Sequence, residues 1–111
     1  MNEIIITTMN DLPGYEVTEV LGETFGLIVR SRNMFSNTGA SFRTIFGGEV
    51  KGYTKLLSES RNHAVDRLKE AVHAKGGNAV LAMRFDCNEI AGIMSEVAAY
   101  GTAVKVKKKK S

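Results

Sequence analysis

Three arginines are the residues whose type and spacing most clearly suggest chemistry. Arg30 and Arg32 stand two positions apart at the end of an apolar strand pattern, so they share one face of an extended chain. Arg43 follows in a short helical pattern, and the free amide groups at the start of a helix also favour anions. A guanidinium group donates two parallel hydrogen bonds to a phosphate or a carboxylate. The pattern therefore predicts a small-anion site at Arg30, Arg32 and Arg43.

A structural role for the same arginines stays open. Buried arginines at interfaces are usually paired with acids. Glu49, Glu96 and the acids of a neighbouring subunit are available as partners. The sequence favours this structural pairing over anion binding. Among the functions that require a ligand, anion binding is the leading hypothesis.

Metal binding has three candidate ligands, His63, His73 and Cys87. A tight site for a soft metal needs three or four such side chains at one point. The two histidines are ten residues apart on a predicted helix, which separates them by about 80° and about three turns. Cys87 has no second cysteine nearby. The sequence predicts no metal site and no cofactor within one subunit. A metal site that takes one ligand from each subunit of a ring stays an open alternative.

No catalytic constellation is present. The chain has no GxSxG sequence, no Walker-type phosphate loop and no HExxH helix. An enzyme is therefore the least favoured class of function, although the sequence does not exclude it.

Charge is concentrated at one end of the chain. The net charge is +3, and five of the fifteen basic residues are Lys105 and Lys107 to Lys110. Residues 107–111 are interpreted as a frayed basic tail after a single domain at 1–106. Nucleic-acid binding would rest on this tail alone, because the aromatic residues fall mostly at predicted core positions, so it is not expected.

The expected location is the cytoplasm. No apolar run approaches the roughly 18 residues that cross a bilayer, and the first residues lack the positive charge of a signal peptide. The single cysteine fits a reducing compartment.

Hydrophobic periodicity predicts an α+β subunit of two layers, with one short and one long helix on an antiparallel-rich sheet. The long helix has an inner stripe that includes Leu57, Ala64 and Leu68, and Gly76 is predicted to cap it. The short helix is capped by Asn37 or Thr38. Bends or bulges are expected at Gly22 and Gly26. The predicted strands are 3–8, 15–30, 79–86 and 96–106, and the predicted helices are about 38–46 and 53–75.

Three glycines, Gly47, Gly48 and Gly52, are interpreted as backbone devices that bring the short helix close to a neighbour. The last predicted strand is apolar on both faces. One layer of helices covers only one face of a sheet. The second face therefore predicts self-association.

Several segments together resemble the YbjQ-like family of small bacterial proteins, which are sometimes labelled heavy-metal-binding. The resemblance implies an α+β subunit in a ring-like homo-oligomer, most often a pentamer, and brings no reaction or catalytic residue. The leading hypothesis is a non-enzymatic oligomer that binds a small anion or serves as a scaffold, and the alternative is a heavy-metal-binding oligomer. The matching segments are LPGYEV at 12–17, EVLG at 19–22, VRSRN at 29–33, GGEVKGYTKLL at 47–57, GGNAV at 76–80, RFD at 84–86 and EVAAYGTAV at 96–104.

Overall fold

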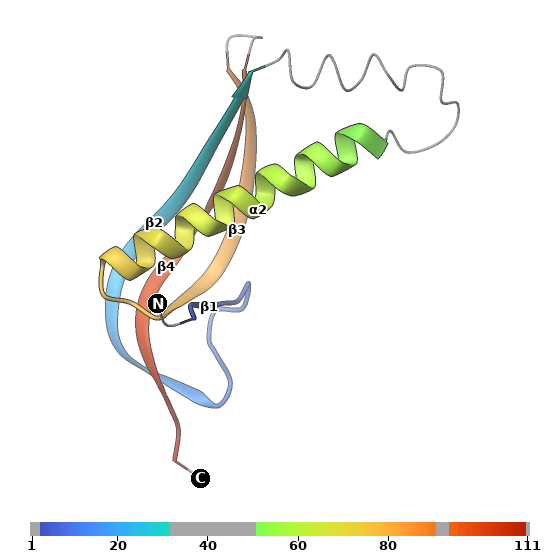
Figure 1. Cartoon of the computed structure of the whole chain (residues 1–111). Helices are drawn as coiled ribbons and strands as arrows, with labels where there is room; N and C mark the ends of the chain where they lie inside the picture. The colour runs from blue at the N-terminus through green and yellow to red at the C-terminus, as the bar shows by residue number, and fades with distance from the viewer. Residues whose placement is uncertain (1–2, 32–50, 91–93, 111) are drawn as a thin grey trace.

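The computed structural model describes residues 3–31, 51–90 and 94–110. In these ranges the chain forms one helix and four strands (Figure 1). The elements, in chain order, are β1 (Ile5–Ile6), β2 (Tyr15–Ser31), α2 (Lys51–Ala74), β3 (Ala79–Ile90) and β4 (Met94–Lys108).

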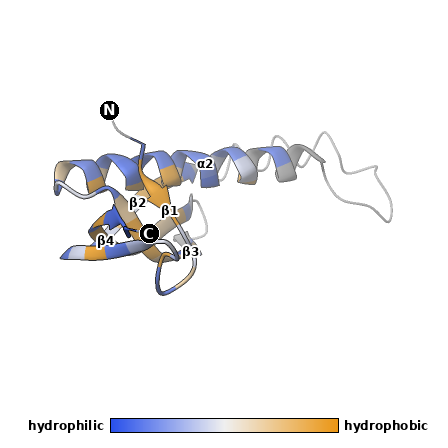
Figure 2. Ribbon diagram, turned by 90° about the horizontal axis from the view of Figure 1, so that it is seen from below, coloured by the Kyte–Doolittle hydropathy of each residue, from blue (hydrophilic) through white to orange (hydrophobic). Residues whose placement is uncertain are grey.

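The four strands form one mixed sheet in the order β1-β3-β4-β2. Strand β4 is antiparallel to both of its neighbours, and β1 pairs with β3 in parallel. Helix α2 lies along one side of the sheet, as Figure 2 shows from below. The α+β class is thus confirmed. The described residues contain one helix rather than two, because the predicted short helix falls in residues 32–50, outside the described ranges.

Helix α2 buries one side chain in every four. Ser60, Ala64, Leu68 and Val72 are all fully buried, at a spacing close to one helical turn. Leu57 was expected on the same stripe, but 43% of its surface is exposed. The first turns of α2 extend beyond the strands, so that part of the stripe has no sheet beneath it (Figure 1).

Glycine ends α2 as predicted. Gly76 has a φ of 84°, in the left-handed region where a side chain is disfavoured. The Gly76 amide donates to the His73 carbonyl and the Gly77 amide to the Val72 carbonyl, both at 2.9 Å. These two bonds form a Schellman cap.

Gly26 has a different role from the predicted one. The register between β2 and β4 shifts near Gly22, which confirms a bulge there, and runs regularly from Gly22 to Ser31. Gly26 therefore sits in unbulged strand. A Cβ atom at Gly26 would collide with the backbone of α2 at Ala64 and Leu68. The absent side chain lets the helix lie directly on the strand.

The lysine-rich end of the chain belongs to the sheet. Lys107 pairs with Glu16 and Lys108 with Tyr15 in the β2–β4 register, and the Lys109 amide donates to the Gly14 carbonyl at 2.9 Å. The expectation of a frayed tail is therefore wrong as far as Lys109. Cross-strand ion pairing contributes to this order, because Lys107 Nζ lies 3.1 Å from Glu16 Oε1.

The sheet carries a hydrophobic cluster on each face. The cluster under α2 includes Ile28, Leu68 and Val97. The cluster on the opposite face lies at the other end of the strands, where Leu12 and Tyr15 cover it. Its buried members are Ala79, Leu81, Val104 and Val106.

One position of β3 stores backbone strain. Ala82 has a φ of 55°, and a register shift against β4 falls at this point. Its amide donates to the Met9 carbonyl at 2.7 Å, which fixes this conformation. A left-handed conformation costs an alanine about 1–2 kcal/mol, whereas glycine has no such cost.

Replacing Ala82 with glycine is therefore expected to stabilise the fold by about 1 kcal/mol, since the relief of strain exceeds the added entropy of the unfolded chain. Urea unfolding at a fixed protein concentration measures the change. Ala98→Gly, on β4, is the matched control and should destabilise by about 0.5–1 kcal/mol. Equal destabilisation by both substitutions would contradict this account of Ala82.

Candidate functional site

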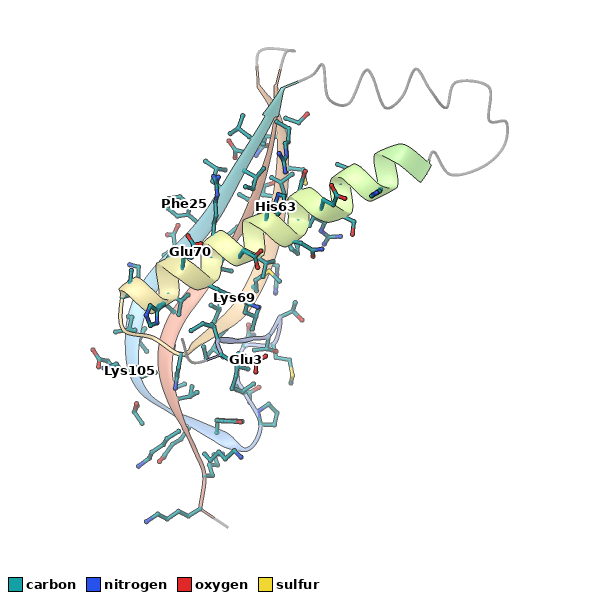
Figure 3. The ribbon with its side chains drawn as sticks, viewed as in Figure 1. Glu3, Phe25, His63, Lys69, Glu70 and Lys105 are labelled. Atoms are coloured by element: carbon teal, nitrogen blue, oxygen red, sulfur yellow. The ribbon has the colours of Figure 1, made fainter. Side chains whose placement is uncertain are left out.

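Arg30 belongs to strand β2, and its side chain contacts helix α2. Its Nε atom donates to Ser60 Oγ at 3.4 Å, and its NH2 group donates to His63 Nδ1 at 2.6 Å. The Arg30 residue is half-buried and Ser60 is fully buried. Figure 3 labels His63 on α2, in the part of the helix that crosses the sheet. Arg32 and Arg43, the other two arginines of the predicted site, lie outside the described residues.

The contact between Arg30 and His63 defines the state of the imidazole. A guanidinium group has five N–H donors and no acceptor, so His63 Nδ1 must be the acceptor in this contact. This hydrogen bond requires the tautomer of His63 that carries its proton on Nε2. The Nε2–H group then points away from Arg30, because the two ring nitrogens lie on different sides of the imidazole.

The predicted acidic partner of Arg30 is not found in the described part of the chain. Glu96 pairs with Val29, so the β2–β4 register places it on the face opposite Arg30. Glu49, the other candidate, lies outside the described residues. Within the described ranges, the ion pairs are Lys105–Glu19 at 3.6 Å and Lys107–Glu16 at 3.1 Å, and neither involves Arg30.

Arg67 adds a second guanidinium group one turn further along α2. Its NH1 group donates to the Leu27 carbonyl of β2 at 2.7 Å. His63 and Arg67 are four residues apart, which places them on the same side of the helix. Arg30, His63 and Arg67 thus follow the line along which α2 meets β2.

Sequence reasoning identified Arg30 but missed Ser60, His63 and Arg67. His63 is exposed, and its contact with Arg30 is a feature that the sequence did not predict. The spacing of 60, 63 and 67, which places three polar residues along one side of a helix, was the available signal. It does not show which strand the helix packs against.

The glycines predicted to shape an assembly contact are placed only in part. Gly47 and Gly48 lie outside the described residues. Gly52 was expected before the long helix, but α2 is described from Lys51, so Gly52 is inside its first turn.

The three soft metal ligands of the chain are dispersed. His63 contacts Arg30, whereas His73 stands in the last turn of α2, about 15 Å along the helix axis. Cys87 pairs with Val97 in the β3–β4 register and is exposed. Among residues 3–31, 51–90 and 94–110, no group of three or more His, Cys, Asp or Glu side chains comes together.

A shallow hollow of about 390 Å³ opens beside the end of α2. Several of its polar groups are already bonded within the protein. Asn78 exchanges two hydrogen bonds with the backbone of Val106, at 2.9 and 2.8 Å, and Thr18 Oγ1 donates to the Lys105 carbonyl at 3.2 Å. These bonds occupy Asn78 and Thr18, so neither side chain indicates a ligand site in the hollow.

The sheet face opposite α2 carries exposed apolar side chains. Gly26 contacts the helix, so its neighbour Phe25 points to the opposite face. Phe25, labelled in Figure 3, is 59% exposed. In the β2–β4 register it pairs with Tyr100. We call this surface the uncovered sheet face; its members are Val17, Val20, Phe25, Val29 and Tyr100.

No helix in the described residues is both long and apolar enough to pass through a membrane.

Comparison with known proteins gives consistent matches over almost the whole chain. The YbjQ family model, described as "Putative heavy-metal-binding", matches residues 4–107. The UPF0145 protein YjfJ of Lactococcus lactis is 55% identical over 108 residues, which cover 97% of this chain and 99% of that protein. A UPF0145 protein of Streptomyces griseus is 53% identical over 106 residues, which cover 96% of this chain and 88% of the relative.

A solved structure supports the fold. A DUF74-family protein of unknown function from Pediococcus pentosaceus superposes with a TM-score of 0.50 over 94% of this chain and 98% of its own, at 18% identity. That similarity concerns the fold alone, whereas the family follows from the sequence matches. The chain belongs to the YbjQ-like family of bacterial UPF0145 proteins, whose function is unassigned.

Proposed function

We propose that this protein is a non-enzymatic, cytoplasmic homo-oligomer that binds a small anion or serves as a scaffold. The observation that carries the proposal is the uncovered sheet face. Val17, Val20, Phe25 and Val29 are between 44% and 66% exposed, and Tyr100 is 38% exposed. Glu23 and Glu96 interrupt this face, but the number of apolar side chains exposed on it still indicates an interaction site.

The chain covers only part of this face by itself. Leu12 and Tyr15 pack against the buried cluster at one end of the strands. Towards the other end, Phe25 and Val29 have no comparable cover from the described residues. A second copy of the chain is the partner we propose, because the same apolar surface is then removed from water in every subunit.

The outer edge of β2 adds to this argument. This strand is 17 residues long and lies at the end of the sheet, with β4 as its neighbour. Long edge strands are templates for pairing with another chain. Arg67 already occupies the Leu27 carbonyl, so the rest of the edge and the uncovered sheet face are the surfaces left for association. The family resemblance makes a pentameric ring the assembly that we expect.

Light scattering on the purified protein tests this proposal. We expect a particle of about five times the subunit mass of 12.1 kDa, stable on dilution to micromolar concentration. A monodisperse particle of 12.1 kDa at that concentration would refute self-association. Native mass spectrometry gives the subunit number independently and detects any ligand that co-purifies.

Anion binding is supported by the surroundings of Arg30. A half-buried guanidinium group, with no acid pairing it in the described ranges, has donors left for a ligand. The cytoplasmic location is supported by the free, exposed Cys87, which is typical of a reducing compartment.

Heavy-metal binding is the second candidate, because the matching family model is described in those words. The residues present do not fit a soft metal within one subunit. The chain has two histidines and one cysteine, all within the described ranges, and the structure separates them. A site would require ligands from several subunits.

We expect less than one equivalent of zinc or copper per subunit after equilibrium dialysis, with no difference between the wild type and Cys87→Ser. Retention of a full equivalent that is lost in Cys87→Ser would overturn this ranking and favour a metal site at a subunit interface. His73→Gln is a useful companion, since a shared site that uses both residues would respond to either substitution.

A further inference from the structure

We infer that the first turns of α2 dock on the uncovered sheet face of a second copy of the chain. This inference rests on the proposed self-association and names the two surfaces that meet. We call residues 51–59 of the helix the α2 overhang. The overhang and the sheet face are unlike each other, so each subunit contacts one neighbour through its helix and another neighbour through its sheet.

A ring of five subunits restricts the kind of contact between them. A surface that packs on its own equivalent in a second copy forms a closed pair, because both copies of that surface are then used. Rings with an odd number of subunits require a head-to-tail contact between two different surfaces. In the proposed pentamer, the uncovered sheet face must therefore contact a different surface of the neighbouring subunit.

Exposed apolar side chains identify the second surface. Among the side chains that the structure describes, seven large hydrophobic ones are exposed, and five of them form the uncovered sheet face. The other two are Met9 and Leu57. Met9 lies in the segment between β1 and β2, and a single exposed hydrophobic residue there is ordinary. Leu57 is different, because it belongs to a helix side that is otherwise buried.

Leu57 continues the buried stripe of α2 beyond the sheet. The helical period places its side chain within about 20° of the direction of Ala64 and of Leu68. Ala64 and Leu68 are fully buried in the cluster under α2. The α2 overhang lies past the strands of its own subunit in both Figure 1 and Figure 2. Leu57 therefore points towards a sheet surface that its own subunit does not supply.

A subunit cannot make this contact with itself. Gly26 contacts α2, so Phe25 points to the face of the sheet away from the helix. The sheet thus separates the α2 overhang from the uncovered sheet face of the same subunit. The face that covers the overhang must belong to another copy, and the contact removes Leu57 and Phe25 from water together.

Light scattering on two variants tests the inference. Leu57→Asp is expected to lower the particle mass to 12.1 kDa, because it places an unpaired carboxylate in the contact. The matched control is Ser58→Asp, which introduces the same charge at an exposed position about 100° further round the helix and should leave the mass unchanged. Circular dichroism should show the same helix content in both variants, since Leu57 lies outside the two buried clusters.

Cysteine cross-linking tests the contact without removing it. In a Cys87→Ser background, the double variant Leu57→Cys with Phe25→Cys is treated with a short bis-maleimide. We expect a ladder of covalent species up to the full ring on a denaturing gel, because each subunit is linked to both neighbours. Each single substitution should give no ladder. Asn62→Cys, at an exposed position of α2, replaces Leu57→Cys in the control and should give no ladder with Phe25→Cys.

The outcomes separate this inference from the proposed function. A wild-type mass of 12.1 kDa would refute self-association, and the inference with it. A wild-type oligomer whose mass is unchanged by Leu57→Asp would refute this contact alone. Covalent dimers formed by Phe25→Cys without Leu57→Cys would show that the uncovered sheet face packs on its own equivalent, which would also overturn the inference.

Discussion

Replacing Gly26 with alanine is expected to destabilise the fold by about 3 kcal/mol, one of the two largest effects that the structure predicts. The added Cβ atom would meet the backbone of α2 at Ala64 and Leu68, and would lie 2.9 Å from the carbonyl carbon of Arg67. Backbone atoms cannot turn aside as a flexible side chain can. The helix must therefore move away from β2, which opens the cluster around Leu68 and Val97.

Urea unfolding at fixed protein concentration measures this effect, because self-association would otherwise change the apparent stability. Thr24→Val is the matched control, two residues earlier on the same face of β2. The Thr24 hydroxyl is buried and has no hydrogen-bond partner among the described residues, so its loss should be neutral or stabilise by about 1 kcal/mol. If Gly26→Ala were as stable as Thr24→Val, the close packing of helix on strand at Gly26 would be wrong.

The same substitution separates structure from ligand binding. If α2 is displaced, Ser60 and His63 move away from Arg30, since all their contacts cross from the helix to the strand. Gly26→Ala should therefore also weaken the proposed anion binding at Arg30, although Gly26 itself does not contact Arg30.

Sequence patterns predicted the parts of the fold that depend on interactions between residues close together in the chain. The end of α2 followed from Gly76, because a left-handed cap has few other solutions. The inner stripe at Ala64 and Leu68 followed from the helical period. The same period failed at Leu57, because whether a helix side is buried depends on how far the sheet extends beneath it. No pattern within the helix contains that information.

The order of the lysine-rich end was missed for a related reason. Lys107 and Lys108 were judged as a run of like charges, which favours a solvated tail. In the structure β2 faces this run, and Glu16 and Glu19 accept two of the lysines. The acids are about 90 residues away in sequence, so only the pairing of the strands reveals the match.

The candidate site shows the same division. Arg30 was identified because it ends a strand together with a second arginine two residues later. Its partners Ser60 and His63 come from another element, 30 and 33 residues away. The prediction that Glu96 pairs with Arg30 is wrong, because the strand register places Glu96 on the opposite face of the sheet. A single sequence does not determine that register.

If the subunits associate as proposed, Phe25→Asp is expected to give a monomer of 12.1 kDa, the second of the two largest effects. Phe25 is 59% exposed at the centre of the uncovered sheet face and pairs across the strands with Tyr100. Association would bury both aromatic rings, which stabilises by about 1.5–3 kcal/mol for each ring. An aspartate at this position would leave an unpaired carboxylate in the interface, at a cost of several kcal/mol.

Light scattering and circular dichroism together measure this outcome, because the substitution lies outside the cluster under α2 and the subunit should keep its secondary structure. Asn62→Asp is the matched control: it introduces the same charge at an exposed position of α2 and should leave the particle mass unchanged. If Phe25→Asp retained the full oligomeric mass, the uncovered sheet face would not be the site of association. The outer edge of β2, a backbone surface that a side-chain charge does not remove, would then be the contact to test next.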